Sequence, residues 1–194
     1  MKTLFFDIDT QLDFLYPAGA LYVPGAEHAV ANIARLNHYA AVHAIPVIST
    51  TDAHPEDDPE FQQWPPHCIA GTTGQHKPEA TLLARRIVIP NREVPLAIER
   101  AQQVIIEKQK LDSFTAPNFA RVVELLDADR FVIYGVVTEV CVLFAARGLL
   151  KYGKPLTLVT DAVAGLTDAG SQAAIEEILA GGGALATANE ICTA

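Results

Sequence analysis

Short apolar runs alternate along the chain with longer segments in which apolar residues recur at helical spacing. The helical segments cover residues 25–44, 118–128, 139–153 and 168–183. The strand-like runs cover residues 3–9, 45–50, 86–90, 101–108, 130–137, 155–162 and 184–188, of which 86–90 is short and ambiguous. Continuous apolar runs are typical of parallel strands that are buried on both faces. We expect one domain over residues 1–194, a three-layer α/β/α sandwich with a mostly parallel six-stranded sheet.

Composition narrows the classes of partner and compartment. The 194 residues are 50% hydrophobic and 19% charged, and the net charge of −9 comes with no run of Lys or Arg, which argues against nucleic acid or an anionic membrane as partner. No apolar stretch is long enough to span a membrane, and acidic residues interrupt the N-terminal apolar run, which we interpret as a strand and not a signal peptide. Three widely spaced cysteines fit a reduced, cytoplasmic protein.

One long irregular stretch, about residues 51–79, interrupts the alternation. It holds Trp64 and three of the six histidines. Because structureless loops of this length are uncommon inside compact domains unless they serve a function, we expect a metal-site or lid loop here.

The strand-like runs end in residues that carry chemistry. Asp9 and Lys108 close the runs 3–9 and 101–108, Asp52 and His54 follow the run 45–50, and Cys141 comes just after the run 130–137. Ligands of open α/β sheets bind beyond the carboxyl ends of the strands, so these side chains are predicted to meet at one edge.

Cys141 has two readings. A lone cysteine among valines and leucines is more often core than catalytic. In the first turn of a helix, however, unsatisfied amides and the positive end of the dipole favour a thiolate, and the same amides are suited to an oxyanion hole. Cys68 and Cys192 are expected to be structural.

The acids in and after the run 3–9 and the lysines at the end of the run 101–108 also divide between catalytic and structural roles. Asp9 lies at the strand end and is the better catalytic candidate, whereas Asp7 is expected to be structural and Asp13 to be a turn acid. Lys108 is a candidate for stabilising charge near a carboxylate and a thiol, with Lys110 as its rival.

Asp52 and His54, in a D-x-H pattern at a strand end, point to one side. With the later His67 they predict a divalent metal site that leaves positions open for water or substrate. Glu60 is the preferred fourth ligand. Its competitors are Glu56, Asp57 and Asp58.

Five motifs, in order, resemble the isochorismatase-like cysteine hydrolases and, within them, the nicotinamidases: "DIDTQLDF", "STTDAHP", "WPPHCIAGTTG", "IEKQKLDSF" and "YGVVTEVCV". The resemblance implies a catalytic triad of Asp9, Lys108 and Cys141. It also implies a metal site at Asp52, His54 and His67, which many other members, including true isochorismatases, lack. It further implies a cis peptide at Val136–Val137, with the amides of Val137 and Cys141 in an oxyanion hole.

The chain also departs from the nicotinamidase pattern. Ala53 stands where an aromatic residue is usual, and "EDDPEF" replaces polar and aromatic residues near the substrate pocket. Phe14 and Trp64 are the expected walls for a flat ring.

The predicted function is a metal-assisted amidase that hydrolyses nicotinamide to nicotinate and ammonia. The alternatives are a related amidase acting on a small ureido or carbamoyl amide, an isochorismatase, and a catalytically inactive binding module. The expected cofactor is one divalent ion, zinc first and manganese or iron next, because the ligand set suits all three. The resemblance also implies a homo-oligomer.

Overall fold

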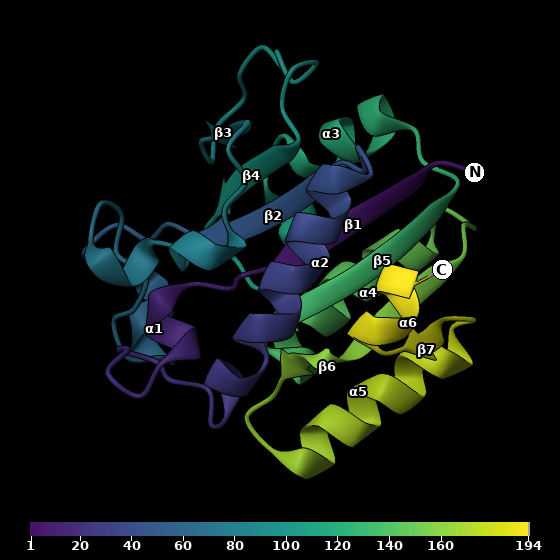
Figure 1. Cartoon of the computed structure of the whole chain (residues 1–194). Coiled ribbons are helices and arrows are strands. Elements are labelled where there is room, and N and C mark those ends of the chain that lie inside the picture. The colour runs from purple at the N-terminus through teal and green to yellow at the C-terminus, as the bar shows by residue number, and fades with distance from the viewer. Residues whose placement is uncertain (194) are drawn as a thin grey trace.

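The protein forms a single parallel sheet of seven strands, seen in a computed structural model that describes residues 1–193 (Figure 1). Its order is β3-β4-β2-β1-β5-β6-β7. The strands are β1 (Thr3–Ile8), β2 (Val47–Asp52), β3 (Arg86–Ile89), β4 (Gln103–Lys108), β5 (Arg130–Val136), β6 (Leu156–Ala164) and β7 (Ala184–Ala186).

The predicted sandwich and parallel sheet are therefore present, but the predicted count of six strands is wrong. The two edge strands are the weak signals of the sequence. β3 has four residues and β7 three, and both are largely exposed, so neither carries the long apolar run of a central strand. The segment 184–188 also splits, because Ala188 already begins a short helix.

Helices cover both faces of the sheet. α2 (Val30–Val42) and α6 (Ala188–Thr193) pack on one face, and α3 (Phe119–Leu126), α4 (Leu143–Leu150) and α5 (Asp168–Ala180) pack on the other (Figure 1). The six residues of β1 are all buried and alternate between the two cores, with Phe6 against Phe131 on one side and Phe5 against Tyr134 on the other.

Most of the irregular structure lies beyond the carboxyl ends of the central strands. The four-residue helix α1 (Leu12–Leu15) follows β1 directly. The long stretch after β2 contains only single-turn helices, at Pro59–Gln62, Thr73–Gln75 and Glu79–Thr81. These loops build the candidate site described below.

Gly135 lets the two central strands approach closely at that end. It pairs with Ile8, has φ of +121°, and a Cβ there would lie 2.1 Å from the carbonyl oxygen of Ile8. Only glycine fits this position without a shift of the backbone.

Asp7 is a structural acid, as expected, and its partners are side chains. It accepts hydrogen bonds from Thr10 (2.7 Å), Asn37 (2.9 Å) and Ser49 (3.2 Å), and it pairs with Lys77 at 3.0 Å. These partners satisfy the hydrogen-bonding capacity of the buried carboxylate, which accounts for Asp7 as a structural residue.

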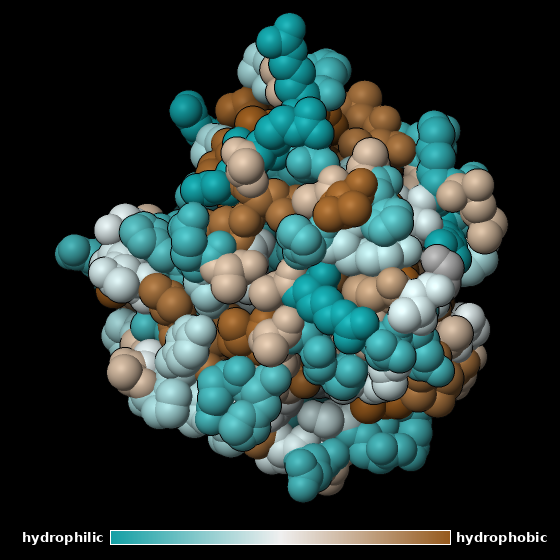
Figure 2. Space-filling model, viewed as in Figure 1, coloured by the Kyte–Doolittle hydropathy of each residue, from teal (hydrophilic) through white to brown (hydrophobic). Residues whose placement is uncertain are grey.

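The surface seen in Figure 2 is mostly hydrophilic, with hydrophobic residues in small groups. Over residues 1–193, the large hydrophobic side chains that are exposed are Met1, Val42, Val88, Leu125, Leu179 and Leu185. No helix in this part of the chain has the length and apolar character needed to cross a membrane. The expected homo-oligomer stays a prediction.

Candidate active site

The structure brings Asp9, Lys108 and Cys141 together at the carboxyl edge of the sheet. Lys108 Nζ lies 2.8 Å from Asp9 Oδ2 in an ion pair whose angles fall outside hydrogen-bond geometry. It lies 2.5 Å from Asp52 Oδ1 and donates to Cys141 Sγ at 3.8 Å. All four side chains are buried, so these charges interact with little screening by solvent.

Burial and neighbouring charges set the protonation of this group. Burial opposes the charge of Lys108, but Asp52 and Asp9 outweigh it and hold the pKa of the ammonium well above its usual value. Burial also raises the pKa of the Cys141 thiol, since Lys108 only partly offsets it while Asp9, through its charge and a hydrogen bond, adds to it. The resting nucleophile is therefore a neutral thiol beside Asp9, not the thiolate that a helix start alone favours.

Asp9 is fixed by its backbone as much as by its partners. It follows β1 with φ of +49°, and its amide donates to the Thr50 carbonyl at 3.2 Å. Thr50 Oγ1 donates to Asp9 Oδ1 at 2.6 Å. One carboxylate oxygen is thus held by Thr50, and the other faces Lys108.

Gln11 is a positioning residue that the sequence analysis missed. Its side-chain nitrogen donates to the carbonyls of Asp52 (2.8 Å) and Gln75 (2.9 Å), and its oxygen accepts from the Asp52 amide at 2.7 Å. The signal available was weak, namely a polar residue two positions after a candidate acid. Its partners lie 41 and 64 residues away.

Cys141 lies in a single π-helical turn, Thr138–Val142, that leads into α4. The expected cis peptide at Val136–Val137 is present. The Val137 carbonyl accepts from the amides on either side of Cys141, those of Val140 and Val142, both at 3.1 Å. Val137 and Cys141 line the same cavity, where the predicted oxyanion hole would lie.

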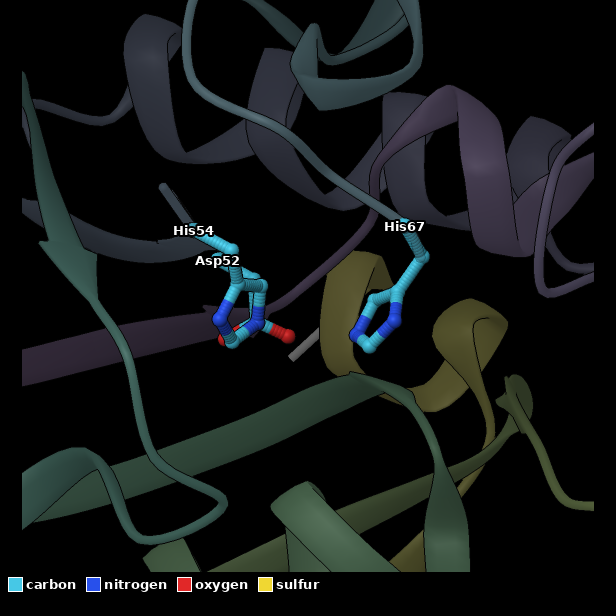
Figure 3. A group of neighbouring side chains, drawn as sticks. All are labelled: Asp52, His54 and His67. Atoms are coloured by element: carbon cyan, nitrogen blue, oxygen red, sulfur yellow. The ribbon is translucent and has the colours of Figure 1, made fainter. Parts of the chain in front are cut away.

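Asp52, His54 and His67 converge as the sequence predicts for a metal site (Figure 3). One ligand atom from each lies within 4.8 Å of the others, and all three residues are buried. His54 Nδ1 bonds to Asp58 Oδ2 at 2.9 Å, whereas the buried His54 Nε2 has no hydrogen-bond partner among residues 1–193. An orphaned imidazole nitrogen beside a carboxylate and a second imidazole fits a divalent cation.

His67 has the protonation that a ligand needs. Its Nδ1 bonds to the Pro65 carbonyl at 2.7 Å, which leaves Nε2 for another partner. Burial lowers the pKa of His67, and the hydrogen bond to Pro65 offsets this only in part. The neutral imidazole is the form that coordinates metals.

Two of the acids considered as fourth metal ligand, Asp58 and Glu60, lie at different positions relative to the group of three. Asp58 lies behind His54, and its other oxygen accepts from the Glu60 amide at 2.9 Å, so it orients the site without facing it. Glu60 lines the adjacent cavity but is not part of the group of three. Its role as fourth ligand stays a prediction.

Asp13 joins three loop segments near the site. It accepts from the amides of Cys68 (2.7 Å) and Ala20 (2.9 Å), and its carboxylate occupies the space that a Cβ at Gly74 would fill. The predicted turn acid therefore also holds the residue next to His67. Cys68 is fully buried, as expected for a structural cysteine, whereas Cys192 is only partly buried.

A cavity of about 410 Å³, the open space at its mouth included, lies over Cys141. Its polar lining consists of Asp52, Glu60, His67 and Cys141. Its apolar walls are Phe14, Leu21, Val23, Trp64, Leu111, Val136, Val137, Val140 and Leu166. The expected walls Phe14 and Trp64 are among them.

Solved structures of similar fold include amidases. A pyrazinamidase of Pyrococcus horikoshii in complex with zinc is 26% identical, with a TM-score of 0.79 over 96% of this chain and 99% of that one. The PnC1 protein of L. infantum in complex with nicotinate is 26% identical, with a TM-score of 0.75 over 97% and 93%. An N-carbamoylsarcosine amidase of Thermoplasma acidophilum, at 22% identity and a TM-score of 0.77 over 97% of both chains, shares the fold.

No curated protein sequence matches this chain. The isochorismatase domain family matches residues 3–190, nearly the whole sequence. The chain therefore belongs to the isochorismatase-like family of hydrolases.

Proposed function

We propose that the protein is a metal-assisted cysteine amidohydrolase that converts nicotinamide and water to nicotinate and ammonia. The observation that carries this proposal is the placement of Asp9, Lys108 and Cys141 under an apolar cavity whose polar side holds Asp52 and His67. The pyrazinamidase with zinc and the relative with nicotinate support the same substrate class.

The first half of the reaction forms a thioester. Asp9 takes the proton from the Cys141 thiol as the sulfur attacks the amide carbonyl. Lys108, 2.8 Å from Asp9 and 3.8 Å from the sulfur, stabilises the charge on whichever of the two is ionised. The amides of Val137 and Cys141 hold the oxyanion, and Asp9 returns the proton to the departing ammonia.

The second half regenerates the thiol. Asp9 takes a proton from water, whose oxygen attacks the thioester carbonyl. The bond to sulfur breaks and the proton passes from Asp9 to the Cys141 sulfur, while the product leaves as nicotinate after its carboxylic acid loses the second proton of the water to solvent. Thr50 keeps one Asp9 oxygen occupied through its 2.6 Å hydrogen bond, so proton transfer falls to the other oxygen.

Asp52, His54 and His67 are the residues that would hold a divalent ion, zinc first and manganese or iron next. Such an ion, when bound, supplies a Lewis acid that can hold a ring nitrogen and water. The chain itself orients the ring between Phe14 and Trp64, which both line the cavity.

Charge favours nicotinamide over two of the alternatives. No lysine or arginine among residues 1–193 lines the cavity, and its lining acids are Asp52 and Glu60. N-carbamoyl amino acids and isochorismate carry carboxylates, which need a cationic partner when they are desolvated, and the side chains of the cavity supply none besides the proposed ion. A neutral heteroaromatic amide needs none. A small neutral ureido amide is the second candidate.

The test is ammonia release from a substrate panel by protein loaded with zinc. We expect turnover of nicotinamide, little of carboxylate-bearing carbamoyl compounds, and none by Cys141→Ala. Cys192→Ala, which removes a cysteine far from the cavity, is the matched control and should keep full activity. Inactivity of the wild type on nicotinamide would refute the substrate. Full activity of Cys141→Ala would refute the mechanism, and binding without turnover of any amide would favour a binding module.

A further inference from the structure

Glu139 joins the turn that carries Cys141 to the loop that carries Leu166, and both of these residues line the cavity. It lies in the turn that carries Cys141, two residues before the sulfur. Its Oε1 accepts hydrogen bonds from the amides of Leu166 (2.9 Å) and Thr167 (3.0 Å), and its Oε2 accepts from Ser171 Oγ at 3.4 Å. These partners all belong to the connection from β6 to α5 or to the first turn of α5.

The connection is shaped around this carboxylate. A Cβ at Gly165 would lie 2.2 Å from Glu139 Oε2, and a Cβ at Gly170 would lie 2.7 Å from Oε1. Two glycines therefore leave the space that the side chain fills. The loop and the carboxylate fit each other in shape as well as in hydrogen bonding.

The simpler interpretation, that Glu139 merely caps α5, does not account for the contacts. Thr167 is the residue that caps this helix, because its side chain accepts from the Gly170 amide at 3.0 Å. Glu139 instead accepts hydrogen bonds from the amides of Leu166 and Thr167, which come before the first residue of α5. Leu166 lines the cavity together with Cys141.

We infer that Glu139 is a positioning residue that sets the width of the substrate cavity by holding Leu166 at a fixed distance from the nucleophile. One oxygen of its carboxylate accepts from both amides, which ties the loop to the turn that carries Cys141. The enzyme thereby selects small flat amides and rejects amides with ring substituents. This inference rests on the proposed amidase function.

The first experiment compares kcat and KM for nicotinamide in three variants. Glu139→Ala should raise KM about tenfold with little change in kcat, because it loosens a binding wall and leaves the reacting groups alone. It should also improve the ratio of activity on an alkyl-substituted nicotinamide to activity on nicotinamide. Glu139→Gln should stay near wild type, since its amide oxygen can accept from both N–H groups. Glu176→Ala, an exposed acid of α5, is the matched control and should change nothing.

A double-mutant cycle tests whether Glu139 acts through Leu166. Leu166→Ala should widen specificity as Glu139→Ala does, and the double variant should be no worse than Leu166→Ala alone. Additive effects would overturn the inference. Should Glu139→Ala not fold, the cycle is run with Ser171→Ala, for which a smaller effect that vanishes on Leu166→Ala is expected.

Hydrogen exchange separates this inference from the proposed function, because it needs no substrate. The Leu166 and Thr167 amides should exchange faster in Glu139→Ala and stay protected in Glu139→Gln. Unchanged protection would refute the positioning role even in an active enzyme. Faster exchange in a protein without amidase activity would refute the proposed function and leave the restraint of Leu166 standing. Faster exchange with unchanged substrate preference would show a merely structural role and overturn the inference.

Discussion

At the scale of single residues, the positive charge of one buried lysine does not balance the two buried carboxylates beside it. Lys108 serves two carboxylates, at 2.5 Å from Asp52 and 2.8 Å from Asp9. Burial raises the pKa of Asp52 to about 6, and Lys108 offsets this only in part while Asp9 adds to it. The excess negative charge of the pair is the electrostatic reason that a cation would bind here.

The raised pKa of Asp52 predicts how metal affinity depends on pH. Below about pH 6 the carboxylate is protonated in the metal-free protein, so an incoming ion must displace a proton. The Kd for zinc should therefore rise about tenfold per pH unit as the pH falls below 6, whereas it should be nearly flat between pH 7 and 8. Because burial lowers the pKa of His67, its proton competes with the ion only at a lower pH than that of an ordinary histidine would. Competition titration with a chromogenic chelator measures this, and a flat profile from pH 5 to 7 would contradict it.

The buried Cys141 thiol leads to a second prediction, which concerns how its rate of alkylation depends on pH. Because burial raises the pKa of Cys141, the thiolate is rare at neutral pH. The rate of carboxamidomethylation at Cys141 should be low at pH 7 and keep rising above pH 9. Peptide mass spectrometry on Cys192→Ala protein isolates this site from the partly buried Cys192. A rate that reaches its plateau between pH 6 and 8 would show a resting thiolate instead.

At the scale of secondary-structure elements, the sequence predicted what depends on local pattern. The central strands and the helices α2 to α5 are visible as apolar runs and helical periodicity, and strand ends indicated Asp9, Asp52, Lys108 and Cys141. For the edge strands the sequence showed only the short runs 86–90 and 184–188, a signal too weak to set the strand count. The roles of Gln11 and Glu139 were not predicted from the sequence, because they come from contacts with residues 27 or more positions away.

Gly135 gives the prediction that belongs to this scale. Gly135→Ala should destabilise the protein by about 4 kcal/mol or more, because its Cβ would lie 2.1 Å from the Ile8 carbonyl oxygen and its φ is +121°. Gly153→Ala is the control, since φ there is also positive, at +66°, but nothing lies within 4 Å of its Cβ. That variant should lose only about 1 kcal/mol. Urea denaturation of both compares them directly, and equal losses would show that strand approach is not the cause.

At the scale of the whole molecule, the sheet supplies rigidity and the loops supply chemistry. The pairings of β1 with β5 and of β2 with β4 fix the backbone positions from which the side chains of Asp9, Asp52 and Lys108 extend. His67 reaches them from a loop with little regular structure. The arrangement separates folding, which rests on the two cores, from metal binding, which joins the loop to the sheet.

This separation predicts how metal affects stability. Metal-free protein should fold, and zinc at about 100 times its Kd should stabilise it by about 2.7 kcal/mol, which is about 5–10 °C in Tm for a chain of this size. His67→Ala should lose most of that gain. His76→Ala is the matched control, because His76 is an exposed histidine of the same loop whose contacts are made by its backbone. Thermal scans of the three proteins with zinc and with a chelator decide the matter. A zinc-dependent rise in Tm that persists in His67→Ala would show that the ion binds elsewhere, because His67 is the residue by which the proposed site joins the loop to the sheet.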